Sequence, residues 1–238
     1  MKYSALVPVK RLALAKSRLS GHLSRELREM LVLDMLKHVV FTLCESDLFE
    51  QVYVVSADVQ VLELVQDWGA EPLREMQPGH NPALQAAAQI ILERAAWRHR
   101  IQTSSGPQAF LAPEYESRRA FQASQSIGLL TISADLPLLS QEDVRMLLAY
   151  GERSQVVLAA STDGSGTNAI LMRPPLLLPY LFGPNSLPAY IQAARQHQVS
   201  YTLVQNAGLA FDIDTQEDVH ELEQSSRAWS RMADLAIS

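Results

Sequence analysis

The sequence has a single cysteine, Cys44, among its 238 residues. One cysteine excludes a framework of intrachain disulfides and supplies no thiolate cluster for zinc. Its place in an apolar helical pattern favours a buried, unreactive thiol. The six histidines show no i, i+4 pairing, so a zinc site built on one helix face is not expected.

Long hydrophobic runs and excess positive charge are also lacking. No stretch of about 18 apolar residues occurs, which argues against a membrane span. Residues 1–8 lack the basic start and the cleavage site of a signal peptide. The 20 lysines and arginines are outnumbered by 26 acidic residues, and because phosphate backbones are bound by clustered cations, nucleic acid is not expected as the main partner. These absences predict a cytoplasmic protein with no membrane-bound or nucleic-acid-binding role.

The organisation of the chain indicates one α/β domain. Hydrophobic residues make up 47% of the sequence, which is enough for a sizeable core, and 238 residues suit a single α/β domain. Short apolar runs typical of buried strands alternate with capped, amphipathic stretches typical of helices. This alternation predicts a mostly parallel sheet with helices on both faces. Because no repeat or linker divides the chain, residues 1–238 are expected to form one domain.

The expected elements can be placed along the chain. Strands are expected at residues 3–9, 51–56, 128–133, 155–160, 168–172, 200–204 and, as a short strand, 211–214. Helices are expected at residues 25–44 after a cap at Ser24, at 58–68 and 81–96, after a capping box of Ser140 and Asp143, from a cap at Ser186 to residue 197, and after Thr215. Residues 98–125 are rich in Gln, Ser, Arg and Pro without clean periodicity, so they are expected to form a long surface loop or insertion.

Three aspartates lie at predicted strand ends: Asp135, Asp212 and Asp214. Ligands of open α/β sheets bind beyond the carboxyl ends of the strands, so Asp135 is expected to project into a crevice there. Asp212 and Asp214 flank Ile213 and point to one face of an extended segment. Carboxylates on one face repel unless a cation lies between them, and a set of oxygen ligands favours Mg²⁺. We predict a magnesium site, the alternative being that Asp135 and Asp214 only cap the helices that follow them.

A basic segment, residues 10–19, leaves the first strand at its carboxyl end. Lys10, Lys16 and Arg18 are therefore expected to reach the same crevice, where they can clamp a polyphosphate and offset the charge of a leaving pyrophosphate. The alternative is an ordinary solvated loop. Neither a Walker motif nor GxGxxG occurs, so the two commonest glycine-rich phosphate loops are absent.

Two further segments have the character of anion sites. Residues 164–168 (GSGTN) offer backbone N–H groups and hydroxyls, although a plain turn is the default interpretation. Residues 182–186 (FGPNS) lie at an expected helix start, where free amides and the helix dipole suit a phosphate or a carboxylate. A simple helix cap accounts for the second segment equally well.

These elements occur in one order along the chain: VPVK (7–10), AKSRL (15–19), SADLPLL (133–139), GTNA (166–169), FGPNS (182–186) and DIDT (212–215). The set resembles the guanylyltransferases of deazaflavin (F-420) coenzyme biosynthesis, the 2-phospho-L-lactate or phosphoenolpyruvate guanylyltransferase family. The resemblance runs from residue 5 to about residue 220. Its Asp-Leu-Pro element is shared with many nucleotidyltransferases, whereas the basic first loop together with FGPNS is much more specific.

The resemblance implies a Rossmann-like, GT-A-like nucleotidyltransferase fold, similar to that of the molybdopterin guanylyltransferases. It implies that the phosphate of phosphoenolpyruvate or 2-phospho-L-lactate attacks the α-phosphorus of GTP and that pyrophosphate leaves. An acceptor phosphate is already an anion at neutral pH, so no general base is needed. Alignment and charge neutralisation would then carry the catalysis.

The resemblance also implies a role for each group of site residues. The phospho-acid would be held by Thr167, Gly183 and Ser186. Magnesium would be held by Asp135, Asp212 and Asp214. The triphosphate would be bound by Lys10, Lys16 and Arg18, which with Asp135 make up the expected catalytic set. Residues 79–84 (GHNPAL) look like a GLN-type element near the nucleotide, which gives Asn81 a nucleotide-binding role, with His80 in place of an apolar residue.

The segment 98–125 departs from the resemblance, since a much shorter connection is expected in that family. The alternatives for it are an excursion at a homodimer surface or one over the active site. Two other functions stay open at this point. One is a nucleotidyltransferase acting on a sugar phosphate or a molybdopterin, and the other is a catalytically silent protein that binds nucleotide, because fold alone does not prove activity.

Overall fold

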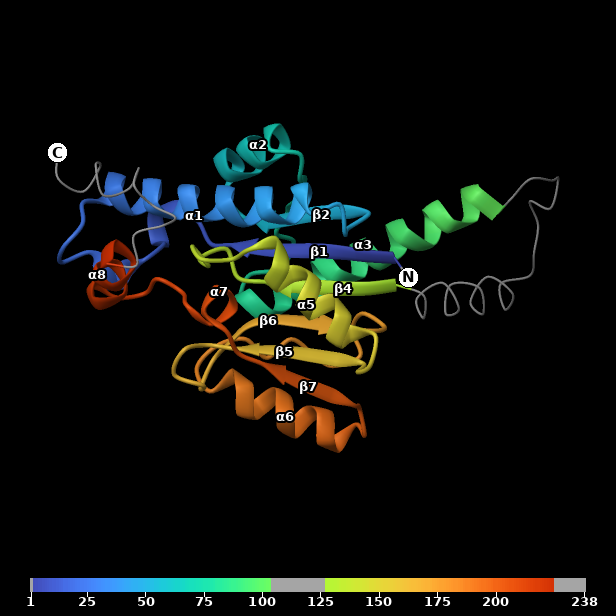
Figure 1. The fold of residues 1–238 in the computed structure, drawn as a ribbon. Coiled ribbons are helices and arrows are strands. Elements are labelled where there is room, and N and C mark those ends of the chain that lie inside the picture. Colours follow the sequence, from blue (N-terminus) through green and yellow to red (C-terminus); the bar gives the residue numbers. More distant parts are fainter. Residues whose placement is uncertain (1, 104–126, 225–238) are drawn as a thin grey trace.

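The computed structural model of the chain describes residues 2–103 and 127–224. Seven strands form one sheet in the order β3-β2-β1-β4-β6-β5-β7. From top to bottom, Figure 1 shows this order from β2 through β1, β4, β6 and β5 to β7. The strands are β1 Lys2–Val9, β2 Gln51–Ser56, β3 Glu71–Arg74, β4 Ile127–Ile132, β5 Val156–Ala160, β6 Thr167–Met172 and β7 Tyr201–Val204. The predicted α/β fold with a mostly parallel sheet is confirmed.

The helices connect these strands, and several begin at predicted caps. They are α1 Arg25–Glu45, α2 Val59–Asp67, α3 His80–Thr103, α5 Gln141–Gly151, α6 Ser186–Gln196, α7 Ala207–Ala210 and α8 Gln216–Gln224. Two 3₁₀ turns, η1 Leu12–Leu14 and η2 Ser17–Leu19, form in the basic first loop. Ser24 caps α1 by accepting from the Leu27 N–H at 3.3 Å. Ser140 and Asp143 form the expected capping box of α5.

Alternate residues of the central strands build one hydrophobic core on each face of the sheet. Val7 and Val54 face the layer that contains α1, α2, α5 and α7, where Met35 of α1 is fully buried. Leu6 and Tyr53 face the opposite layer, formed by α3 and α6. This alternation follows from the period of two along a strand and explains why helices cover both faces.

The direction of β6 determines which of its residues reach the carboxyl edge of the sheet. Strand β6 runs antiparallel to both of its neighbours, β4 and β5, whereas the other pairs are parallel. Ile132 near the end of β4 pairs with Ala169, so Thr167 lies beyond the last residue of β4. The Ser133 N–H extends this ladder by donating to the Asn168 carbonyl at 2.8 Å. The start of β6 therefore meets the ends of β1 and β4.

Helix α3 is longer than predicted. The expected helix at 81–96 runs from His80 to Thr103, so residues 98–103 of the expected surface loop are helical. The cause is local, because no glycine or proline interrupts the sequence between Pro82 and Gly106. Residues 104–125 of the expected insertion lie outside the described residues, and the insertion stays a prediction.

The expected strand at 211–214 is wrong, since this segment has no strand partner. Side chains hold the backbone here instead. The Asn168 amide donates to the Leu209 and Ala210 carbonyls just before the segment, and the Asp214 N–H within it donates to the Asp218 carboxylate at 2.8 Å. Ser186 is also not the cap of α6. Asn185, in a left-handed conformation with φ 55°, precedes the helix, and Ser186 is its first residue.

Strand β3 and helix α7 were not predicted from the sequence. The segment Glu71–Arg74 contains one proline and two charged residues, and Ala207–Ala210 is a single turn. Neither is long enough to show a hydrophobic period. Among residues 2–103 and 127–224, no helix combines the length and the apolar character that crossing a membrane would need.

Candidate active site

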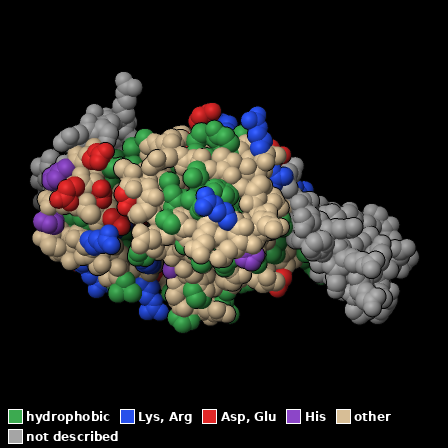
Figure 2. Space-filling model, turned by 90° about the horizontal axis from the view of Figure 1, so that it is seen from below, with side chains coloured by type: hydrophobic (Ala, Val, Ile, Leu, Met, Phe, Trp, Pro, Cys, Tyr) green, Lys and Arg blue, Asp and Glu red, His purple; other side chains and the backbone are tan. Residues whose placement is uncertain are grey.

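A cleft of about 480 Å³ opens at the carboxyl edge of the sheet, where β1 and β4 end and β6 begins. Its walls come from segments far apart in the sequence: the β1 end with the basic first loop, the start of α3, the turn after β4, and residues 182–183. On the face seen in Figure 2, acidic and basic side chains lie together at the end of the molecule that carries α8 in Figure 1. The cleft is thus a charged crevice in the position predicted for ligand binding.

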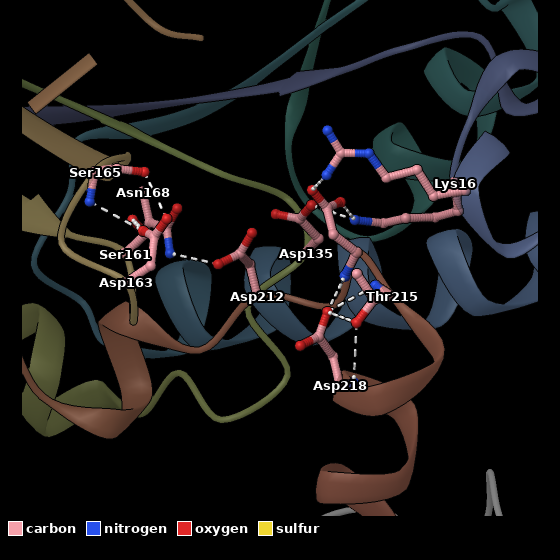
Figure 3. A network of polar contacts seen from close by, with 11 residues as sticks. Lys16, Asp135, Ser161, Asp163, Ser165, Asn168, Asp212, Thr215 and Asp218 are labelled. Atoms are coloured by element: carbon pink, nitrogen blue, oxygen red, sulfur yellow. Dashed lines mark hydrogen bonds and ion pairs between the residues drawn. The ribbon is translucent and has the colours of Figure 1, made fainter. Parts of the chain in front are cut away.

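The three predicted aspartates come together, and two of them, Asp135 and Asp214, line this cleft. One carboxylate oxygen from each of Asp135, Asp212 and Asp214 lies within 4.8 Å of the other two (Figure 3). Ile213 is fully buried, so its two neighbours turn to the same side although the segment is not a strand. Asn168 holds Asp212 by donating to its Oδ1 at 3.1 Å. The spatial grouping that the sequence predicted is therefore present.

Helix α8 fixes Asp214 from the other side. The Asp218 carboxylate accepts from the backbone N–H of Asp214 at 2.8 Å and from that of Thr215 at 2.6 Å (Figure 3). It also accepts from the Thr215 hydroxyl at 2.9 Å. This capping arrangement uses the backbone of Asp214 and leaves its side chain directed to the other two aspartates. The alternative that Asp135 and Asp214 only cap the following helices is therefore wrong, because Asp218 caps α8 and Ser140 with Asp143 caps α5.

The basic first loop reaches these carboxylates. The Lys16 Nζ lies 2.5 Å from Asp135 and 3.0 Å from Asp214, and the Lys16 side chain is only 8% exposed. Arg18 lies 3.3 Å from Asp214 and is largely exposed. Lys10 lines the same cleft. We refer to Lys16, Asp135, Asp212 and Asp214 as the carboxylate side of the cleft.

The pKa values of the carboxylate side follow from where Lys16 sits. Burial opposes the charged form of Lys16, but Asp135 and Asp214 outweigh it and raise the Lys16 pKa. Burial likewise opposes the charge of Asp214, and Lys16 with Arg18 lowers its pKa. Burial and the Asp135 charge raise the pKa of Asp212 to about 6. Negative charge thus remains incompletely balanced at Asp212.

This donor set fits a divalent cation. The carboxylate side offers only oxygen ligands, from two separate segments, and one of the carboxylates has a raised pKa. Hard cations such as Mg²⁺ prefer such oxygen ligands and keep positions for water and substrate phosphates. Asp135, Asp212 and Asp214 would hold such a cation, and Lys16, which pairs with two of these carboxylates, lines the same cleft.

Thr167 and Gly183 line another part of the cleft, and Ser186 follows Gly183 three residues later at the start of α6. Thr167 and Ser186 are buried, and neither hydroxyl has a hydrogen-bond partner among the described residues. Gly183 lines the cleft with φ 134°, a conformation that favours glycine, and its carbonyl accepts from the Ser186 N–H at 3.1 Å. We call Thr167, Gly183 and Ser186 the hydroxyl side. Buried hydroxyls normally have partners, so these two suit a polar ligand.

Residues 180–186, an irregular loop that ends at the first residue of α6, carry two of the three residues of the hydroxyl side, Gly183 and Ser186. The Tyr180 hydroxyl pairs with Thr131 Oγ1 at 2.7 Å, and the Tyr190 hydroxyl accepts from the Leu181 N–H at 2.9 Å. Asn81, predicted to bind nucleotide, instead contacts this loop through its side chain, which bonds the Phe182 backbone at two points. Asn81 does not line the cleft of about 480 Å³, and its nucleotide role stays a prediction.

Sequence reasoning missed roles for His80 and Asn168. His80 lines the cleft at the start of α3. Partial burial of the imidazole in the cleft and the charge of Lys10 lower its pKa, although the residue as a whole is exposed. Asn168 positions Asp212, and its signal was a carboxamide next to Thr167 at the start of a strand that is apolar from Ala169 on. Buried carboxamides need partners, and those of Asn168 are the Leu209 and Ala210 carbonyls at the end of α7 and the Asp212 carboxylate.

Comparison with known proteins gives a consistent family. A family model described as "Guanylyl transferase CofC like" matches residues 3–96 and 115–226. A phosphoenolpyruvate guanylyltransferase of Rubrobacter xylanophilus is 37% identical over 226 residues, which are 94% of this chain and 95% of that protein. A 2-phospho-L-lactate guanylyltransferase of Methanothermobacter thermautotrophicus is 31% identical over 93% of this chain and 84% of its own. A 3-phospho-D-glycerate guanylyltransferase of Colwellia psychrerythraea is 27% identical over 93% and 91%.

Two solved structures illustrate the similarity of fold. A putative nucleotide-diphospho-sugar transferase from Desulfovibrio desulfuricans has a TM-score of 0.70 at 14% identity, covering 97% of this chain and 90% of its own. A 4-diphosphocytidyl-2C-methyl-D-erythritol synthase from Anaerococcus prevotii has a TM-score of 0.55 at 11% identity, covering 94% and 97%. At these identities the likeness shows the fold alone.

Proposed function

The chain belongs to the CofC-like guanylyl transferase family, and on this premise we propose that it transfers GMP from GTP to the phosphate of a small phospho-acid, with Mg²⁺, in coenzyme F-420 biosynthesis. Its relatives are named for three different acids. We propose phosphoenolpyruvate ahead of 2-phospho-L-lactate, because relatives with that name include the 37% identical protein. The observation that carries the proposal is one cleft lined both by Lys16, Asp135 and Asp214 of the carboxylate side and by Thr167 and Gly183 of the hydroxyl side.

The reaction needs no proton transfer. A phosphate oxygen of the acid forms a bond to the α-phosphorus of GTP, and the bond from that phosphorus to the oxygen bridging to the β-phosphate breaks. The products are a diphosphate-linked guanosine adduct of the acid and pyrophosphate. Because the attacking oxygen is already anionic at neutral pH, the protein contributes alignment and compensation of charge.

Each side of the cleft has a role in this proposal. Asp135, Asp212 and Asp214 would hold Mg²⁺, which when bound supplies charge neutralisation to the triphosphate. Lys10, Lys16 and Arg18 would bind the phosphate oxygens and stabilise the departing pyrophosphate.

On the hydroxyl side, the Thr167 and Ser186 hydroxyls and the backbone at Gly183 would hold the phospho-acid. This assignment gives the two buried hydroxyls the partners that they lack among the described residues.

The test is pyrophosphate release by purified protein with GTP, Mg²⁺ and one acid at a time: phosphoenolpyruvate, 2-phospho-L-lactate or 3-phospho-D-glycerate. We expect release that needs both GTP and an acid, fastest with phosphoenolpyruvate. Glucose 1-phosphate as acceptor and CTP as donor serve as controls for the sugar-phosphate alternative. Nucleotide binding without release with any acceptor would refute the proposal in favour of a silent binding protein.

A further inference from the structure

The side chain of Asn81 forms a two-point bond with the backbone of Phe182, 101 residues away. Its Nδ2 donates to the Phe182 carbonyl at 2.9 Å, and its Oδ1 accepts from the Phe182 N–H at 2.9 Å. A carboxamide is suited to this contact because it carries a donor and an acceptor side by side, like a backbone peptide. The contact joins the first turn of α3 to the 180–186 loop.

The bonded residue directly precedes the glycine on the hydroxyl side. Gly183 has a φ of 134°, and because glycine has no Cβ its backbone resists rotation less than that of other residues. Holding both the N–H and the C=O of Phe182 fixes the direction in which the chain enters Gly183. The same short stretch leads through Asn185, also left-handed, to the buried Ser186 hydroxyl.

Aromatic packing holds the same residue from the remaining sides. The Phe182 ring stacks on Tyr180 at 6.1 Å between centroids and meets Tyr190 edge-on at 5.7 Å. His80, next to Asn81, approaches it edge-on at 5.6 Å. The rings limit where the side chain lies, whereas the Asn81 pair limits how the peptide is turned. Irregular backbone that shapes a site needs such support to stay within a few tenths of an ångström of its working geometry.

We propose that Asn81 is a positioning residue for the phospho-acid and not a ligand of GTP. This inference rests on the proposed function, since it assigns Gly183 and Ser186 to the acid. Loss of the Asn81 pair would let the 180–186 loop rotate at Gly183 and would weaken acid binding. The residues proposed to bind the triphosphate, Lys10, Lys16 and Arg18, would keep their places.

The experiment compares Asn81→Ala and Asn81→Asp with a matched control, Gln85→Ala, on an exposed position of the next turn of α3. Aspartate can accept from the Phe182 N–H but cannot donate to its carbonyl, so both Asn81 variants lose the pair. We expect KM for phosphoenolpyruvate to rise about tenfold in both variants, as for one lost hydrogen-bonded contact. KM for GTP should change less than about twofold, and Gln85→Ala should change neither.

Two outcomes overturn the inference. A rise in KM for GTP with an unchanged KM for the acid would make Asn81 a nucleotide residue after all. A lower melting temperature with both KM values unchanged would leave it with a structural role only.

Hydrogen–deuterium exchange separates this inference from the proposed function. Faster exchange at Phe182 in Asn81→Ala is expected whether or not any acid is turned over, and unchanged exchange there would show that the pair does not order the loop. Absence of turnover by the unmodified protein with every acid refutes the proposed function alone.

Discussion

The two walls of the cleft satisfy their polar groups in opposite ways. On the carboxylate side, Lys16 lies within 3.0 Å of both Asp135 and Asp214, so charged groups of the protein are one another's partners. On the hydroxyl side, the Thr167 and Ser186 hydroxyls have no partner among the described residues, while side chains hold the backbone of Leu181 and Phe182 nearby. Under the proposed function, the carboxylate side would exchange partners when a cation and a triphosphate bind. The hydroxyl side would gain partners from the phospho-acid.

This difference separates the energetic roles of the two walls. Paired charges stabilise the unliganded protein, and their removal disturbs both stability and activity. Unpartnered buried hydroxyls cost stability, so their removal should affect ligand binding while leaving the fold intact. Substitutions on the two walls therefore have different signatures, and each signature can be measured.

The largest effect is expected on the carboxylate side, for Asp135→Asn. The change removes one carboxylate from the proposed cation site and the closest partner of Lys16 while keeping the side-chain shape. We expect kcat/KM in the pyrophosphate assay to fall by on the order of 10²–10³-fold, the size of losing one preorganised electrostatic contact. Asp67→Asn, at an exposed position ending α2, is the control and should leave the rate unchanged. Full activity in Asp135→Asn would refute the metal assignment.

The hydroxyl side is tested by Thr167→Val, which removes a hydroxyl and keeps the branched shape. Since this hydroxyl has no described partner, the melting temperature should stay the same or rise slightly. We expect KM for the phospho-acid to rise about tenfold, the equivalent of roughly 1.4 kcal/mol.

The matched control is Thr202→Val on β7, whose hydroxyl pairs with Ser154 at 2.7 Å near the start of β5, away from the cleft. This variant should lose about 0.5–1.5 kcal/mol of stability and keep its KM values. The comparison fails if Thr167→Val destabilises the protein as much as Thr202→Val, because Thr167 would then be an ordinary structural hydroxyl.

The carboxylate side was largely predictable from sequence because its signals are local. The strand at 51–56 and the capping box of Ser140 and Asp143 were predicted residue for residue. The rule that sheet ligands lie beyond strand ends grouped Asp135 with Asp212 and Asp214, although the strand expected at 211–214 is not formed. The pairing of Lys16 with two of these carboxylates was not predicted. Lys16 itself adopts a left-handed backbone conformation, and its side-chain direction depends on that conformation.

The support of the hydroxyl side could not be read from local pattern. Asn81 and Phe182 are 101 residues apart, and neither lies in a periodic segment that would reveal the contact. The position of Thr167 at the cleft depends on β6 lying between β4 and β5, and the short connection from β5 to β6 predicts their antiparallel pairing but not the place of β6 beside β4. Motif resemblance indicated Thr167, Gly183 and Ser186, but only the fold shows what holds them in place.

The smallest expected effect concerns the pH dependence of stability and distinguishes Asp212 from the other two aspartates. Lys16 pairs with Asp135 and Asp214, whereas Asp212 is held by the neutral Asn168. Burial and the Asp135 charge raise the Asp212 pKa from 3.8 to about 6 in the folded protein. A raised folded-state pKa favours the protonated form, so the associated stability is present below pH 4 and is lost as the pH rises through 6. Asp212→Asn, which cannot ionise, escapes this loss.

Metal-free Asp212→Asn should therefore match the unmodified protein near pH 4 and exceed it above pH 6. The shift corresponds to at most about 3 kcal/mol, and partial exposure reduces this to about 1 kcal/mol, or roughly 2–4 °C. Thermal unfolding in a chelator at pH 4, 5, 6 and 7.5 measures the difference. Added Mg²⁺ should reverse it above pH 6, because a cation that binds only the folded carboxylate cluster stabilises the unmodified protein more. Equal melting temperatures at every pH would show that the charge at Asp212 is already balanced.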